Sequence, residues 1–165
     1  MSAVIEALTD AEAHAFLDRQ VVGRVGCHLD GQTYVVPVIY AWDGDCVYVQ
    51  SIEGQKIEMM RANPRVCFEV DEYRSGGGWR SVIVDGTYEE MHGDDASAAL
   101  ALLVRRFSGT PVGHGERRHS DRAPVAFRIR PERTTGRRVG RLSGNGASAH
   151  GVAAALRRAA RRPSL

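Results

Sequence analysis

Four residues between positions 51 and 56 have the types and spacing that suit the binding of an anion: Ser51, Gly54, Gln55 and Lys56. A predicted strand ends at Ser51, the glycine permits a tight turn, and a predicted helix then carries Lys56 in its first turn. The free N–H groups at a helix start attract anions. Together with a hydroxyl and an ammonium group, they would suit a phosphate monoester. A strand, a turn and a helix with a lysine is, by itself, a common arrangement.

Lys56 stands out in composition as well as in place. It is the only lysine among 22 basic residues, and the other 21 are arginine. One interpretation is chance. The other is that this position requires a compact ammonium group, because lysine and arginine bind anions with different geometry. The second interpretation strengthens the prediction of an anion site.

The predicted strand 32–42 is apolar on both faces. Tyr34, Val36, Val38, Tyr40 and Trp42 share one face, and Val35, Pro37, Ile39 and Ala41 share the other. A small antiparallel barrel normally exposes one strand face to water, so a second cover is expected, either another subunit or a flat cofactor. Pro37 cannot donate to a ladder, so the strand must be an edge or bulged there. This position is either a simple edge or a place where free backbone groups meet a ligand.

Trp79, Arg80 and Ser81 form a third group, at the start of a predicted strand that follows the glycine-rich run 75–78. A tryptophan here could stack on a planar ring, and an arginine could contact a phosphate. The alternative is a tryptophan in the core beside an arginine on the surface.

Histidines and cysteines indicate neither a metal site nor a nucleophile. His114 and His119 lie in one polar loop, with no third ligand near them in the sequence. Cys27, Cys46 and Cys67 are odd in number, widely spaced and set in apolar runs. This pattern predicts buried small side chains instead of disulfides.

Short strands and three helices must position these groups. Thr9 and Glu12 form a capping box before an apolar helical periodicity, which predicts the first helix. Asp30-Gly31 predicts a tight hairpin turn. The other predicted helices span 54–62 and 94–108, and the predicted strands span 21–28, 32–42, 46–51, 66–73, 79–91 and 126–130. This pattern predicts a mainly β (α+β) fold, a small antiparallel barrel with helical covers.

Charge divides the chain at residue 132. Residues 1–132 carry 14 basic and 20 acidic side chains, whereas residues 133–165 carry eight arginines and no acid. We therefore predict a domain over 1–132 and a basic extension, rich in glycine, alanine and arginine, over 133–165. The extension is interpreted as solvated chain. The alternatives are docking on the acidic body or a partner, and contact with nucleic acid or a membrane surface.

Apolar runs are all shorter than the roughly 20 residues that span a bilayer, and the first eight residues lack the pattern of a signal peptide. We therefore expect a cytoplasmic protein. Neither a membrane nor a nucleic acid is expected as its partner.

The ordered set of motifs resembles the pyridoxamine-phosphate-oxidase-like FMN-binding split barrels. It is most similar to the branch that contains the 5-nitroimidazole resistance proteins. The resemblance covers about residues 8–108, with a weaker match near Arg137. No single motif is specific, but their order is. The runs that carry the resemblance span 22–26, 30–31, 34–40, 54–56, 61–71 and 79–86.

The resemblance implies a six-stranded antiparallel split β-barrel of Greek-key type, a homodimer, and two FMN sites between the subunits. Three groups of residues would form each site. Pro37, Val38, Ile39 and Tyr40 would line the flavin ring, Ser51, Gln55 and Lys56 would hold the phosphate, and Trp79, Arg80 and Ser81 would complete the site from the partner subunit.

The resemblance also implies an FMN-dependent oxidoreductase whose substrate is a small aromatic, nitro or pyridoxal-like compound. In such a protein the flavin carries the redox chemistry, and the chain supplies binding, orientation and electrostatics. We expect the substrate near Tyr40, Trp42 and the loop 109–122. The sequence lacks the C-terminal segment with tryptophan and arginine of true pyridoxamine phosphate oxidases. It also lacks the active-site histidine of the nitroimidazole branch in the stretch 50–56, which argues against either of those activities.

Two alternatives concern the ligand. The chain could be a non-catalytic carrier, store or sensor of flavin or haem, because no acid or base is recognisable beside the predicted ring. A deazaflavin could also replace FMN, and the basic groove for its longer tail would come from Arg137, Arg138 and Arg141.

Overall fold

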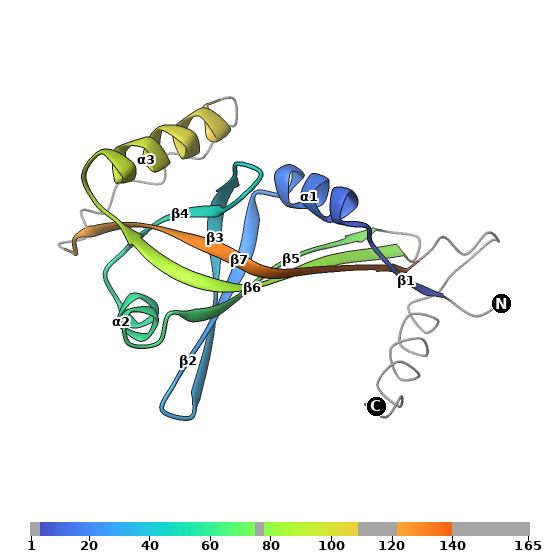
Figure 1. Ribbon diagram of the computed structural model, residues 1–165, viewed down its shortest axis with the longest axis horizontal. Coiled ribbons are helices and arrows are strands. Elements are labelled where there is room, and N and C mark those ends of the chain that lie inside the picture. The colour runs from blue at the N-terminus through green and yellow to red at the C-terminus, as the bar shows by residue number, and fades with distance from the viewer. Residues whose placement is uncertain (1–3, 75–77, 109–121, 140–165) are drawn as a thin grey trace.

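The computed structural model describes residues 4–74, 78–108 and 122–139 (Figure 1). His114, His119, Arg141, most of the glycine-rich run 75–78 and the chain beyond residue 139 lie outside these residues, as do the predictions made for them.

Seven antiparallel strands form one sheet within the described part of the chain, in the order β1-β7-β4-β3-β2-β5-β6, and an additional pairing of β7 with β6 closes it. The strands are β1 (Ile5–Ala7), β2 (Val22–Leu29), β3 (Gln32–Trp42), β4 (Val47–Ile52), β5 (Arg65–Arg74), β6 (Gly78–Met91) and β7 (Pro124–Val139). The flanking helices are α1 (Asp10–Arg19), α2 (Gln55–Ala62) and α3 (Gly93–Phe107). The predicted mainly β fold is confirmed, with seven strands instead of six.

The N-terminal and C-terminal strands account for the difference. β1 has three residues and pairs with the end of β7, from Ile5 opposite Val139 to Ala7 opposite Arg137. β7 is much longer than the predicted strand 126–130, because it pairs with β6 as far as Arg138. The boundary predicted at residue 132 therefore falls inside β7, and residues 133–139 belong to the sheet.

The β2–β3 hairpin follows the sequence signal closely. Asp30 and Gly31 have φ angles of 49° and 80°, the positive values that a two-residue turn between twisted strands requires. The turn sets the register, in which Leu29 lies opposite Gln32 and Val25 opposite Val36.

The barrel interior is filled by large side chains. Tyr40 and Phe68 are fully buried, and their rings meet edge to face with centroids 4.8 Å apart. The Tyr40 hydroxyl donates to the Leu17 carbonyl of α1 at 2.5 Å, which satisfies its polar atom inside the core. Phe16 and Leu17 of α1 are buried over the same end of the barrel.

α1 and α2 lie at opposite ends of the barrel (Figure 1). α1 lies just before the first residue of β2, whereas Met59 of α2 contacts the Cys27 thiol near the C-terminal end of that strand. The end of α2 is anchored by Asn63, whose side-chain amide donates to the His28 carbonyl at 2.7 Å. Among the described residues, none of the helices combines the length and apolar character that crossing a bilayer demands.

Candidate functional site

β3 and β4 pair over only three residues, and this short pairing creates the main irregularity of the barrel. Tyr40, Ala41 and Trp42 of β3 pair with β4, whereas residues 32–39 pair with β2 alone. Pro37 lies in this singly paired part, opposite Arg24. The predicted edge position of Pro37 is therefore confirmed, and one side of β3 has no neighbouring strand there in the described part of the chain.

A cavity of about 540 Å³ lies where β3 approaches the beginning of α2. Its walls come from β3, from the turn between β4 and α2, from α2 and from the segment just before β7. The lining residues are Tyr34, Glu53, Gly54, Gln55, Glu58 and Arg122. Four of these six lie in the segment 53–58, so the cavity is built around the start of α2.

The start of α2 has no side-chain cap. Gly54 occupies the N-cap position and has no side chain that could accept a hydrogen bond. Its carbonyl accepts from the N–H groups of Ile57 and Glu58, at 2.9 and 3.1 Å. The N–H groups of Gln55 and Lys56 precede these and have no acceptor within the helix. The wall of the cavity therefore includes a helix start that can accept an anion.

Lys56 brings a positive charge to the first turn of α2. Its side chain is half-buried, and burial lowers the pKa of its ammonium group, which the nearby Cys27 thiol partly opposes. Within the described residues, Lys56 takes part in no ion pair. A partly desolvated charge without a partner is unfavourable, so this ammonium group is suited to an anionic ligand.

Ser51 and Gln55 lie on either side of the same turn. The Ser51 hydroxyl donates to the neighbouring Ile52 carbonyl at 3.3 Å, and Gln55 is exposed on the cavity wall. The predicted group of Ser51, Gln55 and Lys56 is thus gathered around one strand-to-helix turn.

The four predicted ring contacts on β3 divide between two faces. Pro37 and Ile39 point outward and are exposed, whereas Val38 and Tyr40 point into the core and are buried. In this structure only the backbone of Val38 and Tyr40 could therefore reach a ligand, and the role of these residues in lining a ring stays a prediction. Trp42 is also buried, with its ring centroid 5.5 Å from that of His14, and the substrate position expected near it stays a prediction.

Trp79, Arg80 and Ser81 lie far from Lys56 within one chain. They pair with Tyr73, Glu72 and Asp71 at the end of the β5–β6 hairpin away from α2 (Figure 1). Trp79 lies eight positions before Thr87, which pairs with Arg65 just after α2, and eight positions span roughly 26 Å along a strand. The Arg80 guanidinium lies 5.3 Å from the centre of the Phe16 ring of α1. A single chain does not bring this group to the cavity.

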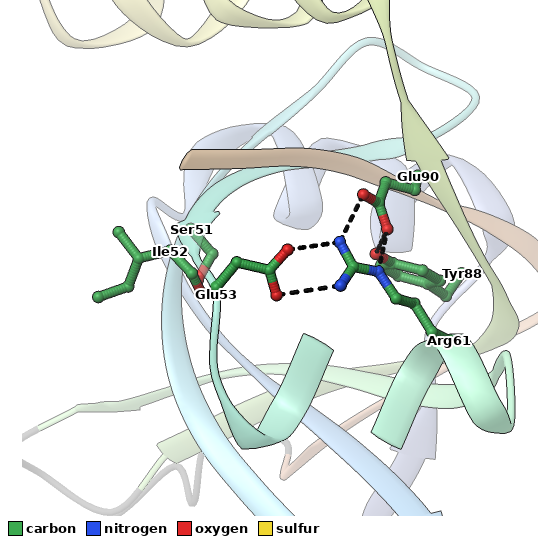
Figure 2. A network of polar contacts seen from close by, with 6 residues as sticks. All are labelled: Ser51, Ile52, Glu53, Arg61, Tyr88 and Glu90. Carbon is green, nitrogen blue, oxygen red and sulfur yellow. Dashed lines mark hydrogen bonds and ion pairs between the residues drawn. The ribbon is translucent and has the colours of Figure 1, made fainter. Parts of the chain in front are cut away.

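Arg61 joins three elements beside the cavity (Figure 2). Its Nη1 and Nη2 donate to both carboxylate oxygens of Glu53, at 3.0 and 2.6 Å. Its Nε and Nη2 donate to both oxygens of Glu90, at 2.6 and 2.7 Å, and the Tyr88 hydroxyl donates to Glu90 at 2.8 Å. The Arg61 guanidinium holds the pKa of Glu90 down at about 2, and both carboxylates raise the pKa of Arg61.

The sequence offers no sign of this network, because its bonded partners lie up to 29 positions apart in the chain. Sequence patterns assign no role to Glu53 or Arg61, and they place Arg122 only at the edge of a polar loop. The Arg122 guanidinium donates to the Glu53 carbonyl at 3.5 Å, so it joins the turn before α2 to the start of β7.

The outer face of β2, β3, β5 and β6 carries a second cavity, of about 770 Å³. Its lining includes Gly26, Val35 and Cys67. Four of its charged groups form ion pairs, Arg24 with Glu69 at 3.2 Å and Arg133 with Asp85 at 2.7 Å. Val22, Val35 and Ile39 on this face are 48%, 58% and 49% exposed. The second, outward apolar face predicted for strand 32–42 is therefore uncovered in a single chain.

The remaining predicted residues have ordinary structural positions. Cys27 and Cys46 are buried as predicted, but Cys67 is exposed, because it alternates outward on β5. The Arg138 guanidinium forms ion pairs with Glu6 and Glu12, at 3.0 and 2.6 Å, and the basic groove suggested for a deazaflavin stays a prediction. Among the described residues no group of three or more histidine, cysteine or acidic side chains is arranged to hold a metal ion.

A family model described as pyridoxamine 5'-phosphate oxidase matches residues 9–138. The chain belongs to this family. The resemblance found in the sequence is thus confirmed, and the match runs through β7, in agreement with the length of that strand.

Solved structures support the same conclusion. A FAD-binding protein from Mesorhizobium loti is 38% identical, with a TM-score of 0.72 over 83% of this chain and 99% of that one. A protein from Bacteroides thetaiotaomicron, described as a putative 5-nitroimidazole antibiotic resistance protein, is 20% identical, with a TM-score of 0.65 over 84% of this chain and 89% of that one, and it shares the fold. The split-barrel prediction is confirmed.

A curated relative is similar over a shorter stretch. An uncharacterized protein of Rhizobium meliloti (strain 1021) is 43% identical over 70 residues, which is 42% of this chain. The aligned stretch spans 46% of that relative, less than half of its length.

Proposed function

We propose that this chain binds a flavin nucleotide, with the phosphate at the start of α2 and the ring along the unpaired side of β3. The observation that carries the proposal is Lys56, a half-buried ammonium group without an ion pair among the described residues, in the first turn of an uncapped helix. The 38% identical protein from Mesorhizobium loti, described as FAD-binding, supports a flavin as the ligand.

The residues at this turn fit a phosphate group. The N–H groups at the start of α2 and the Lys56 ammonium group are donors at this turn. Lys56 itself is not part of the cavity wall, to which the Arg122 guanidinium contributes a positive charge. The Glu53 carboxylate also lines the cavity, but both of its oxygens accept from Arg61, which offsets its charge. The exposed Glu58 side chain lines the cavity as well, so the groups that favour a phosphate are those at the turn from Gly54 to Lys56.

The flavin ring would lie against β3 between residues 32 and 39. This part of the strand has a free backbone edge, and the exposed side chains of Pro37 and Ile39 offer an apolar surface for a planar ring. When bound, a flavin supplies two-electron redox chemistry. The chain binds and orients it and excludes water from one side of the ring.

The site would be completed in a homodimer. The exposed apolar residues Val22, Val35 and Ile39 would be covered by the second subunit. The distance from Lys56 to the group Trp79, Arg80 and Ser81 within one chain supports a site to which the partner contributes that group. The proposed activity is that of an FMN- or FAD-dependent oxidoreductase acting on a small aromatic, nitro or pyridoxal-like substrate. A carrier without turnover is the competing outcome.

The first test is an absorbance titration of the purified protein with FMN, FAD and riboflavin. Binding of FMN should be lost or weakened about hundredfold in Lys56→Met, because a charged hydrogen-bond donor is removed from a phosphate. The control is Arg105→Met, which removes a positive charge from an exposed position on α3. Absence of flavin uptake by the wild-type protein would overturn the proposal. Reduction of bound flavin by a nicotinamide donor would separate an oxidoreductase from a carrier.

The shared site has its own test. Lys56→Met subunits and Arg80→Ala subunits, each defective alone, should form one intact site in every mixed dimer. If subunits exchange freely, about a quarter of the wild-type FMN sites should reappear. No recovery in a mixture proven to contain mixed dimers would contradict the contribution from the partner.

A further inference from the structure

We propose that Arg61 is a positioning residue that keeps the phosphate site usable by holding and neutralising the Glu53 carboxylate; this inference rests on the proposed flavin site. Glu53 belongs both to the cavity wall and to the ion-pair network of Arg61 (Figure 2). Arg61 itself is not part of that wall. Arg61 is therefore not placed to bind a phosphate directly, and we assign its effect to the Glu53 carboxylate that it holds.

The Arg61 guanidinium is held by more hydrogen bonds than the cation of a simple surface ion pair. One guanidinium group serves two carboxylates, each through two hydrogen bonds of 2.6 to 3.0 Å. Bidentate pairs of this kind fix orientation as well as charge. The second carboxylate, Glu90, also accepts from the Tyr88 hydroxyl at the end of β6. The network therefore ties the turn before α2 to the barrel wall.

Charge is the reason why this arrangement matters for an anion. A carboxylate on the wall of a phosphate site repels the ligand, and the repulsion is larger than in bulk water because the cavity is partly shielded from solvent. The two bonds from Arg61 turn the Glu53 oxygens toward the guanidinium and offset their charge. Without Arg61, an unpaired carboxylate would remain beside Gly54 and Gln55.

The backbone of the turn has anchors that do not depend on Arg61. The Glu53 N–H donates to the Ala123 carbonyl at 3.0 Å, and the Glu53 carbonyl accepts from Arg122. At the other end of α2, the Tyr88 N–H donates to the Pro64 carbonyl at 2.8 Å. Removal of the Arg61 charge should therefore leave α2 in place, so an electrostatic effect can be separated from unfolding.

The experiment compares FMN with riboflavin, which lacks the phosphate, by titrating the full-length protein. Arg61→Gln should weaken FMN binding about tenfold and change riboflavin binding by less than about twofold. Adding Glu53→Gln to that variant should restore FMN binding to within about threefold of wild type, because the repelling charge is gone. The control is Arg130→Gln, which removes another bidentate partner of a glutamate, Glu89, away from the cavity.

The outcomes separate the two proposals. If the wild-type protein binds neither FMN nor riboflavin, the proposed function fails and this inference fails with it. If wild type binds both, but Arg61→Gln weakens them equally, or Glu53→Gln does not restore FMN binding, Arg61 has only a structural role and the inference alone is overturned. Should Arg61→Gln fail to fold, Glu53→Gln alone decides, because a loss of FMN affinity in that variant would contradict a repelling Glu53.

Discussion

The starts of α1 and α2 differ in how the N–H groups of the first helical turn are satisfied. At α1, the Thr9 hydroxyl accepts from the Glu12 N–H at 3.3 Å, and the Glu12 carboxylate accepts from the Thr9 N–H at 2.9 Å. At α2, Gly54 offers no acceptor, and a half-buried lysine follows in the first turn. A helix start whose donors are satisfied by its own side chains serves stability, whereas one whose donors are left open is available to a ligand.

The largest effect on FMN binding is expected if α2 is given the kind of side-chain cap that α1 has. Gly54→Asp places a carboxylate at the N-cap, where it would accept from the same N–H groups that a phosphate needs. The φ angle of 162° is extended backbone, and a Cβ atom there meets only the end of the Arg122 side chain, at 3.4 Å. We expect FMN affinity to fall at least about tenfold, while thermal stability is kept or slightly raised.

Gly54→Ser is the matched control, because it supplies a neutral cap. It should weaken FMN binding less than Gly54→Asp does. Calorimetric titration of both variants, with melting curves beside it, checks the expectation. Unchanged FMN affinity in Gly54→Asp would place the phosphate elsewhere.

The reverse change at α1 should affect stability alone. Thr9→Ala removes the side-chain acceptor from the start of α1 and should lower the free energy of unfolding by about 1 kcal/mol. FMN affinity should stay unchanged, because the buried face of α1 packs at the other end of the barrel. Urea unfolding and an FMN titration of the same preparation measure both quantities. A large loss of FMN affinity would show that the two helix starts are not separate in function.

The difference between the two helix starts can be predicted from sequence, because both signals are local. Thr9 with Glu12, Asp30 with Gly31, and Gly54 followed by Lys56 each act within a few residues. The alternation of apolar and polar side chains along β5 is a local signal as well. Residue types and their spacing therefore suffice to predict the hairpin turn, several strand ends and the strand-to-helix turn on which the proposed anion site depends.

Long-range features cannot be predicted in this way. Both faces of the strand that holds Tyr40 are apolar, and only the packing of Phe68 and Leu17 decides which face is inside. The length of β7 is underestimated from sequence because its outward residues beyond 130 are largely polar, and its pairing with β6 is what keeps it extended. The Arg61 network depends on the register of β6 relative to α2, which no local pattern encodes.

Lys56 provides a smaller test, in the absence of any ligand. Folding lowers the pKa of its ammonium group, so the protonated form is disfavoured in the folded state, and this cost is present at neutral pH. Lys56→Met should therefore raise the melting temperature by about 1–2 °C at pH 7. The difference in melting temperature between the variant and wild type should narrow as the pH rises toward 10.5, the usual pKa of lysine. A lower melting temperature in the variant would mean that Lys56 has a stabilising partner.

Glu12 gives the smallest and most specific effect. The Thr9 N–H and the Arg138 guanidinium hold the pKa of this carboxylate below its usual 4.5, so its stabilising effect is present above that pH and is lost as the pH falls. The difference in melting temperature between wild type and Glu12→Gln should thus shrink from pH 7 to below pH 4. In an Arg138→Met background the pH dependence should be weaker but still present, because the N–H of residue 9, the larger cause, remains. A melting-temperature difference that grows on acidification would contradict the capping role of Glu12. It would also contradict the interpretation that the N–H groups at the start of α1 are satisfied by side chains of the same helix.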